Sequence, residues 1–394
     1  MLNFILKNLY YFFFVSIFIG SSISLSGVYP LRLMAPILLV CFVLFILGNK
    51  TTQKNTFLYT FFWFFSITYF IFTFFSSLIG YASLLIIPEI NDVLNFVMLF
   101  LMLSLLLLFY KYDFRRFYKT SINAIVFLYF LFLFFAVVEI FFDFHFPVSR
   151  FYGTPLNIPT AFFTNPNDFA SIFTLLLLVI FTHFRLKLNF LTFLFLLAHM
   201  AIVFYTGSRL SIFVIFLYVL VFRTKTSLRY LLFVAIGLSY FLKEIPSQYK
   251  QLLSIENIMF SSSNKSENIR KNLYMEGAKS LNKHFGLGLG INASTEYYKS
   301  LAGTNGLNGL VNPHNYLVEI LINSGLVNLF LFIILNLFLF YSLFKKGQYE
   351  KSSHIIFFNV LLFSSSSSLF LWPIYFFMYF YFVWADNKIE LIET

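Results

Sequence analysis

Long apolar runs separated by short polar segments constrain this chain more than any other feature of its sequence. A helix that crosses a bilayer needs roughly 20 mostly apolar residues, and about twelve such runs follow one another here. Their approximate bounds are 5–25, 31–48, 56–78, 92–110, 120–142, 167–184, 190–206, 209–222, 228–243, 315–344, 353–371 and 373–385. Charged residues make up 11% of the chain, against about 25% in soluble domains. We therefore predict an all-α integral membrane protein with about 12 transmembrane helices.

The cations of the short loops predict how these helices are oriented. Cytoplasmic loops are enriched in Lys and Arg, and an inside N-terminus places nearly all loop cations on the cytoplasmic side. The short outer segments then hold only Arg32, Arg150 and Arg209. An even number of spans places both termini in the cytoplasm. This topology explains most of the excess of 27 Lys and Arg over 16 Asp and Glu, so we expect no nucleic-acid partner.

One long polar segment, residues 243–314, interrupts the apolar pattern. Its glycines, cations and carboxylates cannot lie in hydrocarbon, where an unsatisfied polar group costs several kcal/mol. The predicted domains are a transmembrane bundle of about nine spans at 1–242, an outward-facing, partly helical lobe at 243–314, and C-terminal transmembrane helices at 315–394. The large lobe therefore precedes the tenth span, and we expect the chemistry there.

Several classes of function are disfavoured by what the loops and spans contain. The inner loops hold no glycine-rich nucleotide-binding loop, which argues against ATP-driven work. No internal repeat is apparent, which weakens the hypothesis of a transporter without excluding it. A transporter also needs ionisable residues within its spans, and Glu139 and His183 are the main candidates. No His, Asp or Glu cluster has metal-ligand spacing, so we predict no metal and no cofactor.

Two of the outer arginines, Arg209 and Arg150, are candidate functional residues. Arg209 follows Thr206-Gly207-Ser208 and opens a run, where a guanidinium either extends to the lipid headgroups or binds an anion. Arg150 begins a loop that continues to Asn165-Pro166-Asn167-Asp168. These last four residues predict a turn that caps the next helix.

The outer lobe combines a cation with a glycine-rich turn. Arg270 lies in a predicted helix that ends near His284, and Gly286, Gly288 and Gly290 follow it. Glycines allow close approach of a ligand, and successive backbone amides can hold phosphate oxygens. A turn that returns the chain to the membrane would have the same composition, so both interpretations stay open.

A histidine opens the span after the lobe. His314 follows Asn312-Pro313 and precedes Asn315; at an aqueous interface it can take a proton from a hydroxyl group, or bond to lipid headgroups as an ordinary helix residue. Arginine suits pyrophosphate because its planar guanidinium makes paired hydrogen bonds to phosphate oxygens. If Arg209 and Arg270 converge on His314, they would hold a lipid-linked sugar diphosphate beside a general base.

These motifs resemble the O-antigen ligase and O-antigen polymerase superfamily of bacterial envelope glycosyltransferases. The ligase branch has His followed by Asn, Ser or Gln, then nine residues, Gly, two residues, and Gly, Thr or Tyr. His314-Asn315 and Gly325 match this pattern, but Asn328 stands at its last position. The other matching positions are Gly207-Ser208-Arg209, Arg270, the Gly286–Gly290 segment, and Arg150 through Asn167, which resembles a segment of the polymerases. The resemblance covers roughly 150–330.

The resemblance implies a multi-span glycosyltransferase that acts at the periplasmic face of the inner membrane. Its donor is a glycan on undecaprenyl pyrophosphate; a polymerase transfers it to another lipid-linked repeat unit, and a ligase to lipid A–core. By this resemblance His314 is the general base and Arg209 and Arg270 bind pyrophosphate, with Arg150, Asn315, Gly288 and Gly290 as further substrate-binding candidates and Glu319 as a second choice for orienting His314.

The first hypothesis is a metal-independent repeat-unit polymerase. The alternatives are a ligase and, from another class, a flippase of lipid-linked oligosaccharides. The expected partners are the undecaprenyl-pyrophosphate-linked oligosaccharide and the lipid bilayer. A chain-length regulator protein is a further candidate partner.

Overall fold

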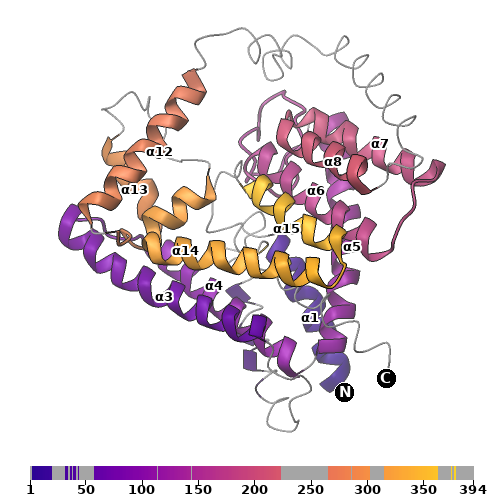
Figure 1. The fold of residues 1–394 in the computed structure, drawn as a ribbon. Helices are drawn as coiled ribbons and strands as arrows, with labels where there is room; N and C mark the ends of the chain where they lie inside the picture. Colours follow the sequence, from indigo (N-terminus) through magenta and orange to yellow (C-terminus); the bar gives the residue numbers. More distant parts are fainter. Residues whose placement is uncertain are drawn as a thin grey trace. The chain divides into compact units, whose positions relative to one another are not determined.

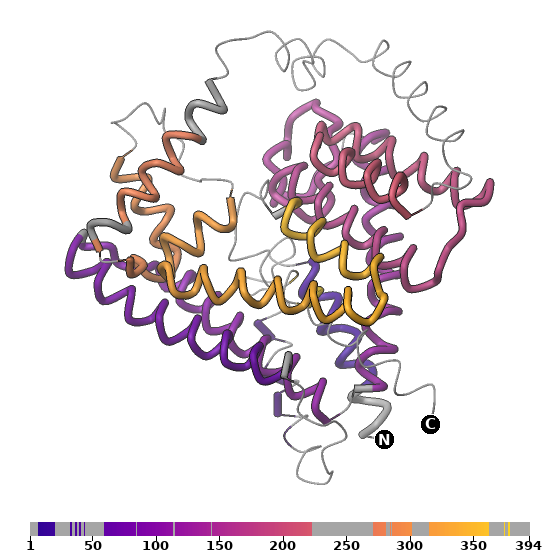
Figure 2. The backbone as a smooth tube through the Cα atoms, in the orientation of Figure 1, coloured from indigo at the N-terminus to yellow at the C-terminus, as the bar shows by residue number. Residues whose placement is uncertain are grey.

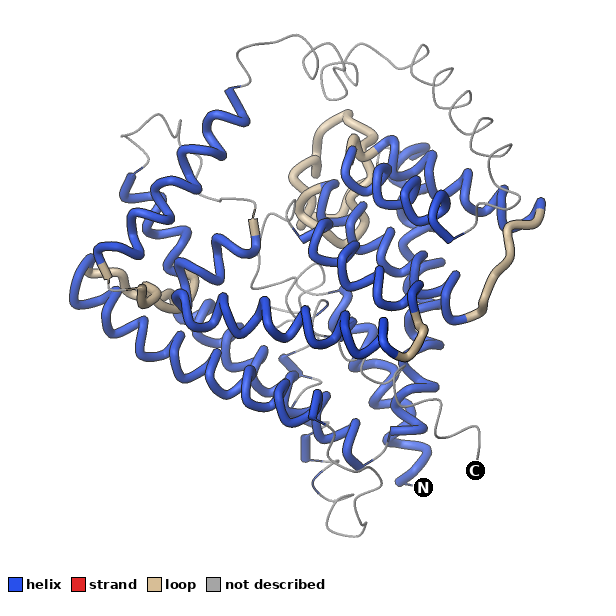
Figure 3. Tube along the Cα trace, in the orientation of Figure 1, coloured by secondary structure: helices blue, strands red, loops and turns tan. Residues whose placement is uncertain are grey.

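The described residues form helices joined by loops and turns, and the computed structural model shows no strand among them (Figure 3). The described residues are 2–19, 32–33, 36–37, 39–40, 43, 57–112, 114–142, 144–222, 265–284, 286–301, 315–362, 374 and 377–378. The helices, labelled in Figure 1, are α1 (Leu2–Ile19), α3 (Phe57–Leu84), α4 (Ile90–Tyr112), α5 (Phe114–Phe142), α6 (Pro166–His183), α7 (Phe190–Tyr205), α8 (Arg209–Phe222), α12 (Lys265–Lys283), α13 (Ala293–Leu301), α14 (Tyr316–Lys345) and α15 (Tyr349–Leu362).

Five of these helices are long and apolar enough to cross a membrane. They comprise Tyr59–Ser83, Ile90–Tyr112, Arg115–Phe142, Pro166–His183 and Tyr316–Lys345. Shorter apolar helices cover Lys7–Ile19, Phe190–Tyr205 and Arg209–Phe222. The prediction of an all-α membrane protein is confirmed at this level. Most of the predicted run 31–48, the run 228–243 and most of the run 373–385 lie outside the described residues, so the figure of about 12 spans stays a prediction.

The chain divides into two compact units. One consists of Met1–Leu128 and Ile269–Thr394, and the other of Tyr129–Asn268. The boundary falls within α5, so this helix contributes its first half to one unit and its second half to the other. The predicted boundaries at 242/243 and 314/315 lie outside the described residues.

Helix α3 is the centre of the first unit. It packs along α14 over much of its length, as Figure 2 shows, with Phe65 against Phe332 at a ring separation of 6.1 Å. On another side it meets α4, where Phe70 and Phe96 lie 4.6 Å apart. The sequence favours such contacts because α3 carries Phe on each of its turns up to Phe75, and each Phe can bury 150–250 Å².

Helix α14 is broken in its first third. Gly325 has a φ of 84° and a ψ of −179°, so residues 316–324 and 326–345 are two helical pieces joined at this glycine. A positive φ is readily adopted only by glycine. The break lets the first piece leave the direction of the long second piece.

The second unit contains the second half of α5, the loop at 144–165, and helices α6, α7 and α8. Its core is polar at one point, because Tyr129 Oη lies 3.0 Å from Nδ1 of His199 and Phe173 stacks on the His199 ring at 4.2 Å. All three side chains are fully buried. Helix α6 is the most enclosed of the spans, with nearly all of its residues buried.

Candidate functional site

Arg209 stands at the tip of the helical hairpin formed by α7 and α8. The turn is tight because Gly207 adopts a φ of 71° and its amide donates to Phe204 O at 2.9 Å. Ser208, which is buried, shares a hydrogen bond of 3.0 Å with the Ser211 hydroxyl. Arg209 itself is exposed and has no hydrogen bond or ion pair to another described residue. The hydrogen-bonded turn thus exposes a guanidinium that forms no bond to the described residues.

Arg150 lies in the loop between α5 and α6, and this whole loop from 144 to 165 is described. Its amide donates to Thr164 O at 3.0 Å, and its guanidinium lies 4.7 Å from the centre of the Phe151 ring. Partial burial lowers the pKa of Arg150, while the nearby Asp168 carboxylate raises it. Arginine stays charged under these influences because its guanidinium loses a proton only far above physiological pH. Arg150 is therefore a partly shielded cation at the base of the loop.

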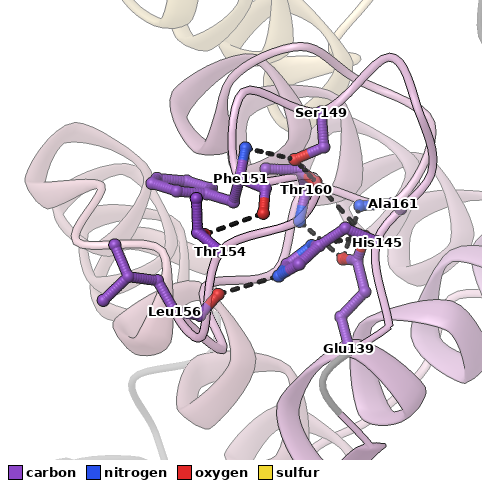
Figure 4. A network of polar contacts seen from close by, with 8 residues as sticks. All are labelled: Glu139, His145, Ser149, Phe151, Thr154, Leu156, Thr160 and Ala161. Atoms are coloured by element: carbon purple, nitrogen blue, oxygen red, sulfur yellow. Dashed lines mark hydrogen bonds and ion pairs between the residues drawn. The ribbon is translucent and has the colours of Figure 1, made fainter.

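The loop is anchored on Glu139, a buried residue in the last turn of α5 (Figure 4). Its Oε2 accepts hydrogen bonds from the amides of Thr160 at 2.6 Å and Ala161 at 2.7 Å. Its Oε1 lies 3.2 Å from Nδ1 of His145. Nε2 of His145 donates to Leu156 O at 2.8 Å. One carboxylate thus ties two distant points of the loop to the end of the helix.

The same network reaches the segment that carries Arg150. Thr160 Oγ1 donates to Ser149 Oγ at 2.8 Å, and the amide of Phe151 donates to Ser149 Oγ at 3.1 Å. The residues on either side of Arg150 are therefore fixed by hydrogen bonds that lead back to Glu139. Sequence reasoning treated Glu139 only as an ionisable residue of a transport pathway; here its carboxylate is already occupied by loop amides. No pattern in the sequence indicated these partners, because they lie 21 and 22 residues away and depend on how the loop folds back.

The predicted cap of α6 is confirmed, with Asn165 as the capping residue. Its side-chain oxygen accepts hydrogen bonds from the amides of Asn167 at 2.7 Å and Asp168 at 3.4 Å. Pro166 occupies the first helical turn, where its missing N–H is not needed. Asn167 and Asp168 therefore belong to the first turn of the helix, and the loop of Arg150 ends at a well-defined point.

The predicted helix around Arg270 is also present, as α12. The side chain of Arg270 lies outside the described residues, but the helix is held by its neighbours. Gly277 faces Tyr298 of α13 and Val318 of α14 so closely that an added Cβ would lie 2.9 Å from the Tyr298 hydroxyl oxygen. Tyr298 donates its hydroxyl hydrogen bond to Leu273 O at 2.7 Å. Helices α12, α13 and the first piece of α14 thus form one packed group.

The glycine-rich segment lies against the break of α14. The amide of Leu289 donates to Ile322 O at 2.7 Å, and the amide of Gly290 donates to Asn323 O at 2.9 Å. Gly288 fits against the backbone of Asn323 and Ser324, which leaves no room for a Cβ. The expectation that successive amides of this segment hold phosphate oxygens finds no support in this arrangement, because the amides of Leu289 and Gly290 are engaged by α14.

Asn315 is the N-cap of α14. Its side-chain oxygen accepts from the amides of Leu317 at 3.0 Å and Val318 at 3.3 Å. His314, the residue before it, lies outside the described residues. Glu319, one turn further, is buried and its amide bonds to Asn315 O at 3.1 Å. The first turn of α14 is therefore a capped, regular start of a helix directly after the predicted general base.

The candidate residues fall into both units of the structure. Gly288, Gly290 and Asn315 belong to one unit together with the helix of Arg270, whereas Arg150 and Arg209 belong to the other. The convergence of Arg209 and Arg270 on His314 stays a prediction. Among the described residues, no group of three His, Cys, Asp or Glu side chains is arranged to hold a metal ion.

Comparison with known proteins bears on the central part of the chain. No curated protein and no solved structure matches it. Residues 191–333 match the family model Wzy_C, described as O-antigen ligase. This stretch contains Arg209, Arg270, the Gly286–Gly290 segment, Asn315 and Gly325, which carry the motifs quoted above. The resemblance of the chain to the O-antigen ligase and polymerase superfamily is therefore confirmed.

Proposed function

We propose that this protein polymerises O-antigen or capsule repeat units at the periplasmic face of the bacterial inner membrane, with both termini in the cytoplasm. Proteins of the matched family are glycosyltransferase-like enzymes that act on lipid-linked polysaccharide. The observation that carries the proposal is that the matched stretch includes Arg209, an exposed guanidinium on a built turn with no partner among the described residues. Such a group is available to bind an anionic substrate.

In the proposed reaction, the donor is a glycan on undecaprenyl pyrophosphate and the acceptor is a hydroxyl group of another lipid-linked repeat unit. His314 takes the proton of that hydroxyl group, and the acceptor oxygen forms a bond to the anomeric carbon. The bond from this carbon to the pyrophosphate oxygen breaks, and undecaprenyl pyrophosphate leaves with the bonding electrons. Arg209 and Arg270 stabilise the departing charge through paired hydrogen bonds, and no metal ion takes part.

The remaining candidates have supporting roles in this proposal. Arg150 adds positive charge on the outer side near the donor, held in place by the network of Glu139. Asn315 keeps the first turn of α14 regular next to His314. The bilayer holds the lipid-linked substrates, and a chain-length regulator is a further candidate partner. In this scheme the protein binds and orients both substrates, and His314 alone moves a proton.

Polymerisation is favoured over ligation by two features of the sequence. Asn328 stands where the ligase motif has Gly, Thr or Tyr, and the loop from Arg150 to Asn167 resembles that of the polymerases. In the structure Asn328 is fully buried, and its side-chain nitrogen lies 3.5 Å from Tyr69 O and from Ser324 O. Ligation to lipid A–core is the second candidate, because the matching family model is described as O-antigen ligase.

The transporter hypothesis draws no support from its two candidate residues. Glu139 is engaged by loop amides, as described above, so it is not a free carboxylate in a pathway. His183 is the last residue of α6 and lies beside Phe184, with ring centres 4.8 Å apart. Neither residue lines a described polar passage.

The test is His314→Ala in the source cell, with the surface glycan resolved by size on a gel and the protein quantified in the membrane. The matched control is His183→Ala, which removes a histidine at the last residue of α6. Loss of the ladder to a single capped repeat, with a normal ladder in the control, supports polymerisation. Bare core with accumulated lipid-linked polymer assigns ligation instead. An unchanged ladder in His314→Ala overturns the mechanism.

A further inference from the structure

The backbone at the break of α14 exchanges hydrogen bonds with the glycine-rich segment. In an unbroken helix the amide of Leu326 would donate to Ile322 O, four residues earlier. Here Leu326 N donates to Gly286 O at 2.8 Å, and Ile322 O accepts from Leu289 N at 2.7 Å. Both groups freed by the break are therefore satisfied by residues 286–290. In an apolar span an unsatisfied backbone group would cost several kcal/mol, so the segment is what makes the break tolerable.

Three glycines allow this close approach. Gly288 lies on the backbone of Asn323, and a Cβ on Gly325 would lie 2.7 Å from Gly286 O. Gly290 lies against the backbone and hydroxyl of Ser77 on α3. Backbone atoms oppose the added Cβ in all three cases, so they cannot move aside as a flexible side chain would.

The far side of the segment is seated on α3. The carbonyl oxygen of Leu289 lies directly over Gly80, where any Cβ would overlap it. The next residue is held as well, since the amide of Ile291 donates to Ser77 Oγ at 3.1 Å. Beyond it, Asn292 donates from its side-chain nitrogen to Asp92 Oδ2 at 3.0 Å. Gly80 is outside the matched family stretch and outside every motif discussed above.

We propose that residues 286–290 are a backbone clamp that fixes the direction of the first piece of α14, and that Gly80 is a positioning residue for glycan transfer because it seats this clamp. The inference rests on the proposed function, since the first piece of α14 begins at Tyr316, and its N-cap Asn315 directly follows His314. A shift of the clamp turns this piece about Gly325. Misplacing a catalytic group by about 1 Å can cost roughly 10²-fold in rate.

The discriminating variant is Gly80→Ala. Alanine forms helices better than glycine, so the substitution should not destabilise α3 itself. A loss of activity would therefore come from the clash between the added Cβ and Leu289 O. The matched control is Ser83→Ala, at an exposed residue of the same helix whose hydroxyl group donates within the helix to Ile79 O. Ser77→Ala is the second variant if Gly80→Ala fails to reach the membrane, because it removes the acceptor of Ile291 N without adding bulk.

Two readouts are measured on the full-length protein in membranes. The first is transfer of lipid-linked repeat units, extracted from source cells that lack this chain, with kcat and the donor KM determined separately. We expect kcat to fall by roughly 10²-fold in Gly80→Ala with the donor KM unchanged, and Ser77→Ala to show a smaller fall of the same kind. The second is trypsin cleavage at Lys299, an exposed residue of α13, which should become faster as the clamp loosens.

Each other outcome decides against the proposal. A raised donor KM with normal kcat means that the segment binds the donor, and normal kinetics with faster cleavage means that the clamp has no part in positioning. If both the kinetics and the cleavage rate are unchanged, residues 286–290 do not act as a clamp seated on Gly80. If the wild-type protein transfers no lipid-linked repeat units, the proposed function is wrong. The cleavage rate still tests separately whether Gly80 holds residues 286–290 in place.

Discussion

Oε1 of Glu139 lies 3.2 Å from Nδ1 of His145, and both side chains are buried at the start of the loop that carries Arg150. The other oxygen of Glu139 holds the amides of Thr160 and Ala161. A buried carboxylate with this many donors is stable in place because its charge is met by hydrogen bonds. The pair joins the end of a membrane helix to an outer loop, so substitutions at Glu139 should act on the whole loop.

Glu139→Ala should be much more damaging than Glu139→Gln. Alanine leaves the buried amides of Thr160 and Ala161 unpaired, at about 1–3 kcal/mol for each group. A glutamine oxygen can still accept hydrogen bonds from both amides. Thermal unfolding of the purified protein in detergent measures the difference. Equal losses of stability for Gln and Ala would mean that the charge, rather than the hydrogen bonding, holds the loop.

Asn315→Ser should retain activity, and Asn315→Ala should lower it together with stability. Serine is as good an N-cap as asparagine, whereas alanine in this position costs about 1 kcal/mol. The capping bonds to Leu317 N and Val318 N are the contacts of this side chain that the structure describes. The measurement is the length distribution of the surface glycan at matched protein level. If both variants lose the ladder equally, the amide of Asn315 itself contacts substrate.

Arg209→Lys should lower activity without lowering stability. Arg209 is exposed and has no partner among the described residues, so a change of side chain there should alter unfolding by no more than about 0.5 kcal/mol. The planar guanidinium of arginine can bind phosphate through two hydrogen bonds, whereas the ammonium group of lysine acts as a point charge. The donor KM and the melting temperature separate the two effects. Wild-type kinetics in Arg209→Lys would instead fit a guanidinium that extends to the lipid headgroups.

Tyr298→Phe should weaken the group formed by α12, α13 and the first piece of α14. The hydroxyl group donates to Leu273 O at 2.7 Å, and its loss should cost about 1 kcal/mol while the buried ring is kept. The melting temperature at pH 7 measures this loss. Asn336→Ala, in the second piece of α14, serves as a comparison for a polar residue removed elsewhere.

The same tyrosine predicts how stability depends on pH. Burial raises the pKa of Tyr298 above its ordinary value of 10.0, so the folded state favours the protonated phenol. Its contribution is fully present below pH 10 and is lost as pH rises from there through the raised pKa of the folded state. Melting temperatures measured from pH 7 to 11 should fall above pH 10, and less steeply in Tyr298→Phe. Identical slopes would show that Tyr298 ionises as easily in the folded protein as in the unfolded chain.

Local patterns were sufficient to predict the helices. The apolar run 56–78 became α3 and the run 315–344 became α14, because a bilayer-length apolar stretch has few other ways to satisfy its backbone. The helix around Arg270 and the cap of α6 followed from residue spacing and from Asn165-Pro166. These features depend on neighbours within one or two turns, which the sequence displays directly.

The partners of single residues were not predictable in the same way. Glu139 was expected, at most, in a transport pathway, yet its carboxylate holds amides 21 and 22 residues away. The bond between Ile291 N and Ser77 joins positions 214 residues apart. Neither pairing leaves a periodic signal, because each depends on which helices pack together.

The sequence by itself determined that this is a helical membrane protein with a polar lobe and superfamily motifs, because hydropathy, charge distribution and motif order are properties of the chain alone. Only the tertiary structure decided what the glycines do. The segment Gly286–Gly290 has the composition of a ligand-binding turn, but Gly288 lies against the backbone of Asn323. Leu289 N and Leu326 N complete the hydrogen bonds of the helix that is broken at Gly325. A glycine permits close approach of either a ligand or another part of the chain, and only the packing of the helices determines which of the two approaches.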